Sequence, residues 1–128
     1  MIVADSNIWI ALLDASDSQH EKAVRLVSTF EEDLLVPEYV ILEVCTILKQ
    51  KRRKQLASNF VQKILMDPDI HVAASESTHL ARVIDVFCKH EHKHLSFVDV
   101  SLFLLAKSHT VYTFDKKLAS AIKKYDRA

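Results

Sequence analysis

Four short apolar segments, separated by stretches with helical spacing, limit most strongly what this chain can fold into. They cover residues 1–4, 34–36, 70–74 and 111–114. Strands this short and this apolar are typical of a parallel sheet that is buried on both faces, with helices as the connections. The pattern therefore predicts an α/β fold in which helices cover both sides of the sheet.

The connecting stretches repeat their apolar residues at the spacing of a helix. We expect helices over residues 6–13, 19–31, 38–51, 55–66, 77–89, 97–108 and 116–124. In the helix over 77–89, the inner face is predicted to carry Leu80, Ile84, Phe87 and Cys88. Because the chain shows no repeats, linkers or low-complexity segments, we expect one domain over residues 1–128.

Composition and charge exclude several classes of protein. The 128 residues are 49% hydrophobic and 27% charged, as in an ordinary globular domain. The chain has 17 Lys and Arg residues and 17 Asp and Glu residues, so its net charge is zero. A polyanion would therefore bind only to a local positive patch. No apolar run approaches the roughly 18 residues of a membrane span. The chain has no glycine, which excludes a phosphate-binding glycine loop.

Cysteine usage and the N-terminus indicate the cytoplasm. Cys45 and Cys88 lie in apolar helical segments, where we expect two buried, reduced thiols. The N-terminus lacks the basic flank of a signal peptide. We therefore expect a cytoplasmic protein.

Four carboxylates occupy positions that an α/β fold can bring together. Asp5 and Asp115 directly follow the first and fourth predicted strands, whose carboxyl ends form the ligand-binding edge of an open parallel sheet. Asp99 opens the helix before the fourth strand, and Glu43 lies in the 38–51 helix. Each acid alone has an ordinary role: Asp5 and Asp115 as helix caps, Asp99 with Ser96 as a capping box, and Glu43 on a solvated face.

Taken together, the four acids predict a metal site. Carboxylates that converge on one edge repel each other at neutral pH, and a hard divalent cation relieves that repulsion. Mg²⁺ and Mn²⁺ prefer oxygen ligands and keep water molecules that substrate phosphates can replace. Such a site is suited to hydrolysis of a phosphodiester bond.

Four segments carry a resemblance to a known family. "IVADSNIWI", "PEYVILEV", "LSFVDVSLFLLAK" and "VYTFDKKLA" follow each other in this order, and the chain resembles the PIN-domain family, especially its VapC-type ribonuclease toxins. The resemblance implies a three-layer α/β/α sandwich with a short parallel sheet of four or five strands. It also implies a Mg²⁺- or Mn²⁺-dependent endoribonuclease that acts on RNA, with an antitoxin protein as partner and a homodimer as the common assembly.

The resemblance assigns roles to individual residues. Four acids would be catalytic: Asp5, Glu43, Asp99 and Asp115. Three of these acids would ligate the metal, namely Asp5, Asp99 and Asp115. Small polar residues would support the site, and they are Ser6, Asn7, Ser96 and Thr113. Family members commonly have glycine in the turns that here read 92–94 and 108–110, and a fifth strand where 121–128 shows no apolar run.

Cationic segments provide candidate RNA contacts. Lys116 and Lys117 follow Asp115 directly, and Arg52 and Arg53 belong to the run "KQKRRK" over residues 49–54. That run is also interpretable as a solvated helix end, while the histidines of "HEHKH" are expected to form a polar loop.

Two further hypotheses concern partners. An apolar surface around Trp9, Ile10, Leu13 and the 39–48 helix is expected to accept an antitoxin helix or a second subunit. The alternative to a nuclease is a non-catalytic PIN-like module that binds RNA or protein without cutting.

Overall fold

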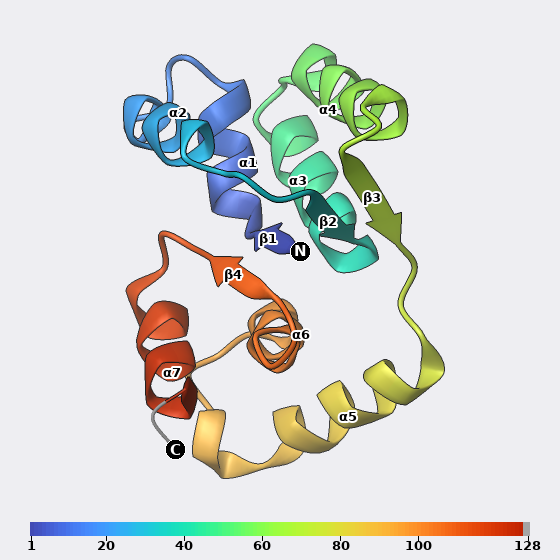
Figure 1. Ribbon diagram of the computed structural model, residues 1–128, viewed down its shortest axis with the longest axis vertical. Helices are drawn as coiled ribbons and strands as arrows, with labels where there is room; N and C mark the ends of the chain where they lie inside the picture. The colour runs from blue at the N-terminus through green and yellow to red at the C-terminus, as the bar shows by residue number, and fades with distance from the viewer. Residues whose placement is uncertain (127–128) are drawn as a thin grey trace.

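A four-stranded sheet in the order β3-β2-β1-β4 organises residues 1–126, which are those that the computed structural model describes (Figure 1). All pairs of neighbouring strands are parallel. The elements in chain order are β1 (Ile2–Ala4), α1 (Ser6–Leu13), α2 (His20–Ser28), β2 (Leu34–Pro37), α3 (Glu38–Gln50), α4 (Lys54–Met66), β3 (Ile70–Ala73), α5 (Ser77–Cys88), the 3-10 helix η1 (His90–His92), α6 (Phe97–Leu105), β4 (Thr110–Tyr112) and α7 (Lys116–Asp126). The predicted parallel α/β fold is confirmed.

The strand order places its reversal between β1 and β4. The chain moves outward from β1 to β2 and β3, then returns to pair β4 with the opposite side of β1. The β1–β4 pairing runs from Ile2 opposite Thr110 to Ala4 opposite Tyr112. Beyond it, the Asp5 amide donates to the Tyr112 carbonyl over 2.9 Å. Ligands of open α/β sheets bind at such a reversal of strand order, outside the carboxyl ends of the strands.

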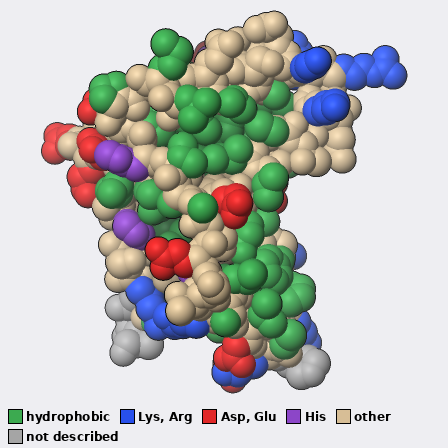
Figure 2. Space-filling view, turned by 90° about the vertical axis from the view of Figure 1, so that its right-hand side faces the viewer, with side chains coloured by type: hydrophobic (Ala, Val, Ile, Leu, Met, Phe, Trp, Pro, Cys, Tyr) green, Lys and Arg blue, Asp and Glu red, His purple; other side chains and the backbone are tan. Residues whose placement is uncertain are grey.

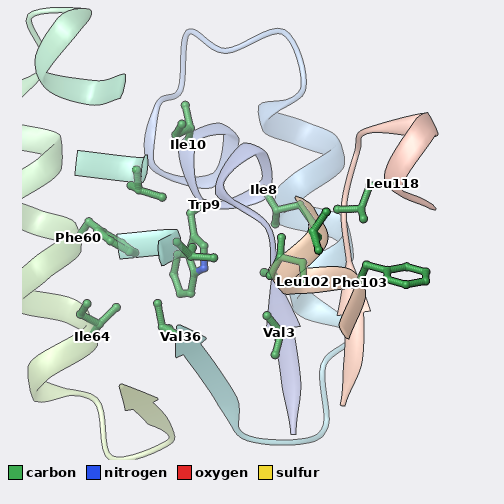
Figure 3. Packing of buried hydrophobic residues seen from close by; sticks show 14 of the residues in the cluster. Val3, Ile8, Trp9, Ile10, Val36, Phe60, Ile64, Leu102, Phe103 and Leu118 are labelled. Carbon is green, nitrogen blue, oxygen red and sulfur yellow. The ribbon is translucent and has the colours of Figure 1, made fainter. Parts of the chain in front are cut away.

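Helices cover both faces of the sheet. Figure 1 shows α1, α2, α3 and α4 on one side and α5, α6 and α7 on the other. Figure 3 shows Trp9 of α1 and Phe60 of α4 packed against Val36 of β2, and the Trp9 and Phe60 ring centroids lie 5.2 Å apart. Burying a side chain of this kind stabilises the fold by about 1.5–3 kcal/mol.

Helix α6 explains the long apolar run near residue 100. It contacts β4, α5 and α7, so its side chains are buried on most sides. The buried residues from its second turn onward are Val100, Ser101, Leu102, Phe103 and Leu104. A helix that is apolar nearly all round is expected to lie inside the protein. The polar exception is satisfied, because Ser101 Oγ lies 2.9 Å from His79 Nε2.

The predicted inner face of α5 is wrong. The side chains that were assigned to it are exposed, and these are Leu80, Ile84, Phe87 and Cys88. Val83 is buried in their place and Val86 is half-buried. The physical reason is that α5 packs on α6 and η1 rather than on the sheet, so that it buries only a narrow strip.

The predicted apolar partner surface is also partly wrong. Trp9 and Ile10 are 2% and 6% exposed and belong to the core. In α3 the side chain of Leu42 is 60% exposed, whereas Cys45 is half-buried and its burial raises the pKa of the thiol. Figure 2, which views the right-hand side of Figure 1, shows hydrophobic side chains gathered in an upper and a lower area with acidic side chains between them.

Several predicted boundaries differ by a few residues. Helix α2 ends at Ser28, whereas the sequence predicted residue 31. Helix α6 ends at Leu105, whereas the sequence predicted residue 108. Strand β4 ends at Tyr112, two residues earlier than predicted. This early end matters for the site, since it releases Thr113 and Phe114 from the ladder. Within residues 1–126, no helix is long and apolar enough to cross a membrane.

Candidate active site at the acidic edge of the sheet

Asp5 is the buried centre of the acidic edge. It follows β1 directly, is 3% exposed and has an extended backbone. Its carboxylate caps α1, because Oδ1 accepts a hydrogen bond from the Ser6 amide over 2.7 Å. On the other oxygen, Oδ2 accepts from the Thr113 hydroxyl, also over 2.7 Å. Asp5 therefore serves as the predicted helix cap and also lies where the strand order reverses between β1 and β4.

Thr113 and Asn7 connect this carboxylate to the segment after β4. The Thr113 hydroxyl donates to Asp5 and accepts from the Asp115 amide over 3.0 Å. Asn7 Nδ2 lies 3.2 Å from the same hydroxyl and 3.4 Å from Asp5 Oδ2. Asn7 Oδ1 accepts from the Phe114 amide over 3.2 Å. Since a hydroxyl has one donor and two acceptor positions, Thr113 is fully satisfied and fixes the two strand ends to each other.

Ser6 connects Asp5 to Glu43. Its hydroxyl donates to Glu43 Oε1 and lies 3.4 Å from Asp5 Oδ1. Ser6 is buried and Glu43 half-buried, because α3 packs against α1 through its buried residues Val40 and Val44. The carboxylate of Glu43 thus lies at the acidic edge rather than on a solvated helix face.

Asp99 forms the predicted capping box. Ser96 Oγ accepts from the Asp99 amide over 3.1 Å, and Asp99 Oδ2 accepts from the Ser96 amide over 3.0 Å. This box uses one carboxylate oxygen. The other oxygen, Oδ1, has no hydrogen-bond partner among the described residues, and it belongs to a half-buried side chain.

Asp115 caps α7 in the same manner. Its Oδ1 accepts from the Lys117 amide over 2.8 Å and from the Leu118 amide over 3.3 Å. Asp5 and Asp115 therefore each cap a helix with one oxygen, and Asp99 closes the capping box of α6 with one oxygen. The N-terminal ends of α1, α6 and α7 therefore each lie beside a carboxylate. The dipole of each helix stabilises the negative charge next to it.

Burial and neighbouring charges act on Asp5 together. The pKa of Asp5 is raised to about 6, with burial as the largest cause and the charges of Glu43 and Asp99 acting in the same direction. The hydrogen bonds from Thr113 and Ser6 lower the pKa and oppose part of this effect. The fields of Glu43 and Asp99 thus reach the Asp5 carboxyl, as expected for acids that share one site.

The groups at this edge that can ligate a metal are carboxylate and hydroxyl oxygens. Within residues 1–126, no three His, Cys, Asp or Glu side chains form a group arranged to hold a metal. A preformed cage of the structural zinc type is therefore lacking among the described residues. An oxygen-only edge with separate carboxylates fits Mg²⁺, which commonly uses one or two carboxylates and completes its shell with water and substrate phosphate.

The four predicted RNA contacts fall in two places. Lys116 and Lys117 are exposed and open α7 beside Asp115. Arg52 and Arg53 lie in the turn after α3, and nine residues separate Arg52 from Glu43, about 13 Å of helix. The structure therefore brings only the two lysines to the acidic edge.

Arg53 has a structural partner that sequence reasoning missed. Its guanidinium lies 3.1 Å from Ser16 Oγ and 3.9 Å from Asp14 Oδ1. Asp14 is 7% exposed, and hydrogen bonds from Ser16 hold the pKa of its carboxyl below the usual range. Arg52 adopts a positive φ of 60°, which an unbranched residue tolerates at a tight turn. No motif around Asp14 signals the pairing with Arg53, because Arg53 lies in a distant turn.

Comparisons with known proteins match most of the chain. Residues 2–124 match the family described as PIN domain. The 23S rRNA-specific endonuclease VapC20 of Mycobacterium tuberculosis is 25% identical over 126 residues, which cover 94% of each chain. The crystal structure of that protein, titled as a Sarcin-Ricin loop cleaving toxin, superposes with a TM-score of 0.83 at 22% identity and covers 94% of this chain and 95% of the other. The crystal structure of PAE2754 from Pyrobaculum aerophilum gives a TM-score of 0.61 at 19% identity, covering 97% and 92%.

Proposed function

Because this chain belongs to the PIN-domain family, we propose that it is an endoribonuclease that hydrolyses RNA phosphodiester bonds, as the toxin of a toxin–antitoxin pair. The observation that carries the proposal is the hydrogen-bonded group of Asp5, Ser6, Glu43 and Thr113 at the strand-order reversal, with Asp115 attached to it. The likeness to a relative named as an rRNA-specific endonuclease supports RNA as the substrate.

We propose Asp5, Asp99 and Asp115 as the residues that hold a Mg²⁺ or Mn²⁺ ion. Their oxygen-only chemistry suits these cations. When bound, such a cation lowers the pKa of a water molecule and stabilises charge that develops on phosphate oxygens. The same cation would offset the mutual repulsion of the acids, which the chain itself relieves in part through hydrogen bonds and helix dipoles.

The protein's own residues hold the acids in place. Thr113 and the Ser6 amide direct the two oxygens of Asp5, and the Ser6 hydroxyl fixes Glu43 beside it. Glu43 is then placed to accept a proton from a water molecule at this edge, because its second oxygen has no hydrogen-bond partner among the described residues. Lys116 and Lys117 are placed to contact phosphates next to the scissile bond.

We also propose partners for the exposed apolar surfaces. Leu80, Ile84 and Phe87 form a row at helical spacing on α5, here named the α5 stripe, and they are 37%, 48% and 46% exposed. Apolar rows of this kind mark protein interfaces. We assign the α5 stripe to a homodimer, and we expect the antitoxin to act on the protein in the cytoplasm.

Cleavage of labelled RNA tests the proposed function. Purified protein is incubated with single-stranded RNA and Mn²⁺, and with EDTA as the metal-free control. We expect cleavage by the native chain with Mn²⁺ and loss of cleavage in EDTA and in Asp5→Asn. Tight binding of RNA without cleavage at any metal concentration would instead support the non-catalytic module.

A further inference from the structure

An open cavity of about 750 Å³ lies between α5, η1, α6 and α7, and is here named the α6–α7 cavity. Its lining contains six Lys and Arg residues: Arg82, Lys89, Lys107, Lys116, Lys117 and Lys124. Glu91 is the one carboxylate among the described lining residues. On a chain whose 17 basic and 17 acidic residues balance, this surplus makes the cavity a local site of positive potential.

The positive charge of the cavity is largely uncompensated. Lys89 Nζ forms a salt bridge with Asp85 over 3.2 Å. The other five cations form no ion pair with a described carboxylate. Concave surfaces lined by one sign of charge attract counter-ions more strongly than flat ones. The cavity is therefore suited to a polyanion.

The floor of the cavity is aromatic. Phe103 contacts Tyr125 at 5.0 Å between ring centroids and His92 at 4.9 Å. Phe103 is buried, whereas His92 and Tyr125 are half-buried. Lys107 Nζ lies 5.2 Å from the Tyr125 ring centroid. An aromatic surface next to lysines offers stacking for a base and contacts for its phosphate.

The cavity borders the acidic edge through Lys116 and Lys117, and the Lys117 amide donates to Asp115. Its rim begins at Lys116 and Lys117, immediately after Asp115. Along α7, eight residues separate Lys116 from Lys124, about 12 Å of helix. At about 3.4 Å per nucleotide of a helical strand, this length corresponds to a few nucleotides.

We propose that the α6–α7 cavity binds single-stranded RNA on one side of the scissile bond. In this arrangement Lys107, Lys116 and Lys124 contact successive phosphates, and a base stacks on Tyr125. The inference rests on the proposed function and names where the substrate lies. An acidic protein segment would use the same charges, but it has no base to stack, so the aromatic floor favours RNA.

Binding in EDTA separates this inference from catalysis. A fluorescein-labelled single-stranded RNA of about ten nucleotides is titrated with the native chain and with a Lys107→Gln/Lys124→Gln double variant, and anisotropy is read. The matched control is Lys93→Gln/Lys123→Gln, which removes two exposed lysines next to the cavity that do not line it. We expect the cavity variant to raise Kd at least fivefold and the control to leave it within twofold.

The salt dependence and the aromatic ring give two further readouts. The logarithm of the association constant falls linearly with the logarithm of the salt concentration. Losing two phosphate contacts should reduce the magnitude of that slope by about 1.4 for a single strand. Tyr125→Leu should raise Kd about tenfold, and Tyr125→Phe should restore it, since a phenyl ring still stacks. Melting curves of all variants verify that they fold.

The possible outcomes separate the cavity assignment from the proposed nuclease function. Unchanged Kd and salt slope in the cavity variant, with a native chain that cleaves RNA, overturn the cavity assignment and leave the proposed function intact. A native chain that binds RNA through these lysines but never cleaves supports the cavity and overturns the nuclease. If the native chain binds an acidic peptide through the same lysines and does not bind RNA, the inference is wrong.

Discussion

The Thr113 hydroxyl donates to Asp5 Oδ2 over 2.7 Å, although the two residues are 108 positions apart in the chain. This bond joins the end of β1 to the segment after β4 and holds the central carboxylate of the acidic edge. The bond exists because β4 ends at Tyr112, which leaves Thr113 free to turn toward Asp5.

Removing the Thr113 hydroxyl should weaken both fold and site. In Thr113→Val the Asp115 amide and Asn7 lose their acceptor, and Asp5 loses a donor. We expect the free energy of unfolding to fall by about 1–3 kcal/mol and the pKa of Asp5 to rise further. Denaturant titration and the pH profile of cleavage measure the two effects. Thr113→Ser keeps the hydroxyl, and a loss in this variant as large as in Thr113→Val would contradict the role given to the bond.

The bond between Ser6 and Glu43 should appear as an energetic coupling. Ser6→Ala and Glu43→Ala, each of which removes one partner of the hydrogen bond, are combined in a double-mutant cycle, and stability is measured by denaturant unfolding. We expect a coupling of about 1 kcal/mol or more, since the hydrogen bond joins a hydroxyl to a charged oxygen. The matched control pairs Ser6→Ala with Thr46→Ala, an exposed residue one turn further along α3, and should be additive. Additivity in both cycles would show that the Ser6–Glu43 bond does not form.

Asp5 should make the metal-free protein less stable as the pH rises. Its folded pKa of about 6 lies above the ordinary aspartate pKa of 3.8, so the folded state binds more protons than the unfolded state between these pH values. Its contribution to stability is therefore present below about pH 4 and is lost as the pH rises through 6, at a cost of about 3 kcal/mol.

Unfolding in EDTA across pH 4 to 7 measures this effect. Asp5→Asn removes the titrating group, so that it should flatten the dependence and raise stability at pH 7 by about 1–3 kcal/mol. A native chain whose stability rises with pH in this range, with no change in slope in Asp5→Asn, would contradict the burial of an ionisable Asp5.

A charge placed in the α5 stripe should disrupt self-association. Ile84→Glu puts a carboxylate into an apolar row that we assign to a homodimer, and burying an unpaired charge is costly. Light scattering at several concentrations should show a dimer for the native chain and a monomer for Ile84→Glu. Thr78→Glu adds the same charge to α5 outside the stripe and should stay dimeric. A native chain that remains monomeric throughout would leave the stripe without this role.

The elements and the acids could be predicted because their signals are local. Asp5 and Asp115 follow strands, and Ser96 with Asp99 forms the capping box that its spacing indicates. The inner face of α5 could not be predicted from periodicity, because apolar residues lie on more than one side and only tertiary packing on α6 selects Val83. The same limit applies to the α6–α7 cavity, whose cations come from three separate elements.

Charge runs proved a poor guide to charged sites. The run over 49–54 is the densest in the sequence, yet its Arg53 pairs with Asp14 inside the chain. Lys107 and Lys124 stand apart in sequence and share one cavity. Residues that are far apart in the sequence but close in space cannot be paired from a single sequence. Only the fold shows that they are neighbours.

Cleavage by Asp99→Asn tests the central claim most directly. The amide oxygen of asparagine still accepts from the Ser96 amide, so that Asp99→Asn keeps the capping box, whose N-cap is Ser96. If Asp99 serves only as a cap, RNA cleavage with Mn²⁺ should match that of the native chain. We expect instead that cleavage is almost abolished while the metal-free melting temperature stays the same or rises, because one of the charges that repel Asp5 is gone. Native-like cleavage by Asp99→Asn, with an unchanged response to Mn²⁺, would contradict the assignment of this edge as a metal-dependent nuclease site.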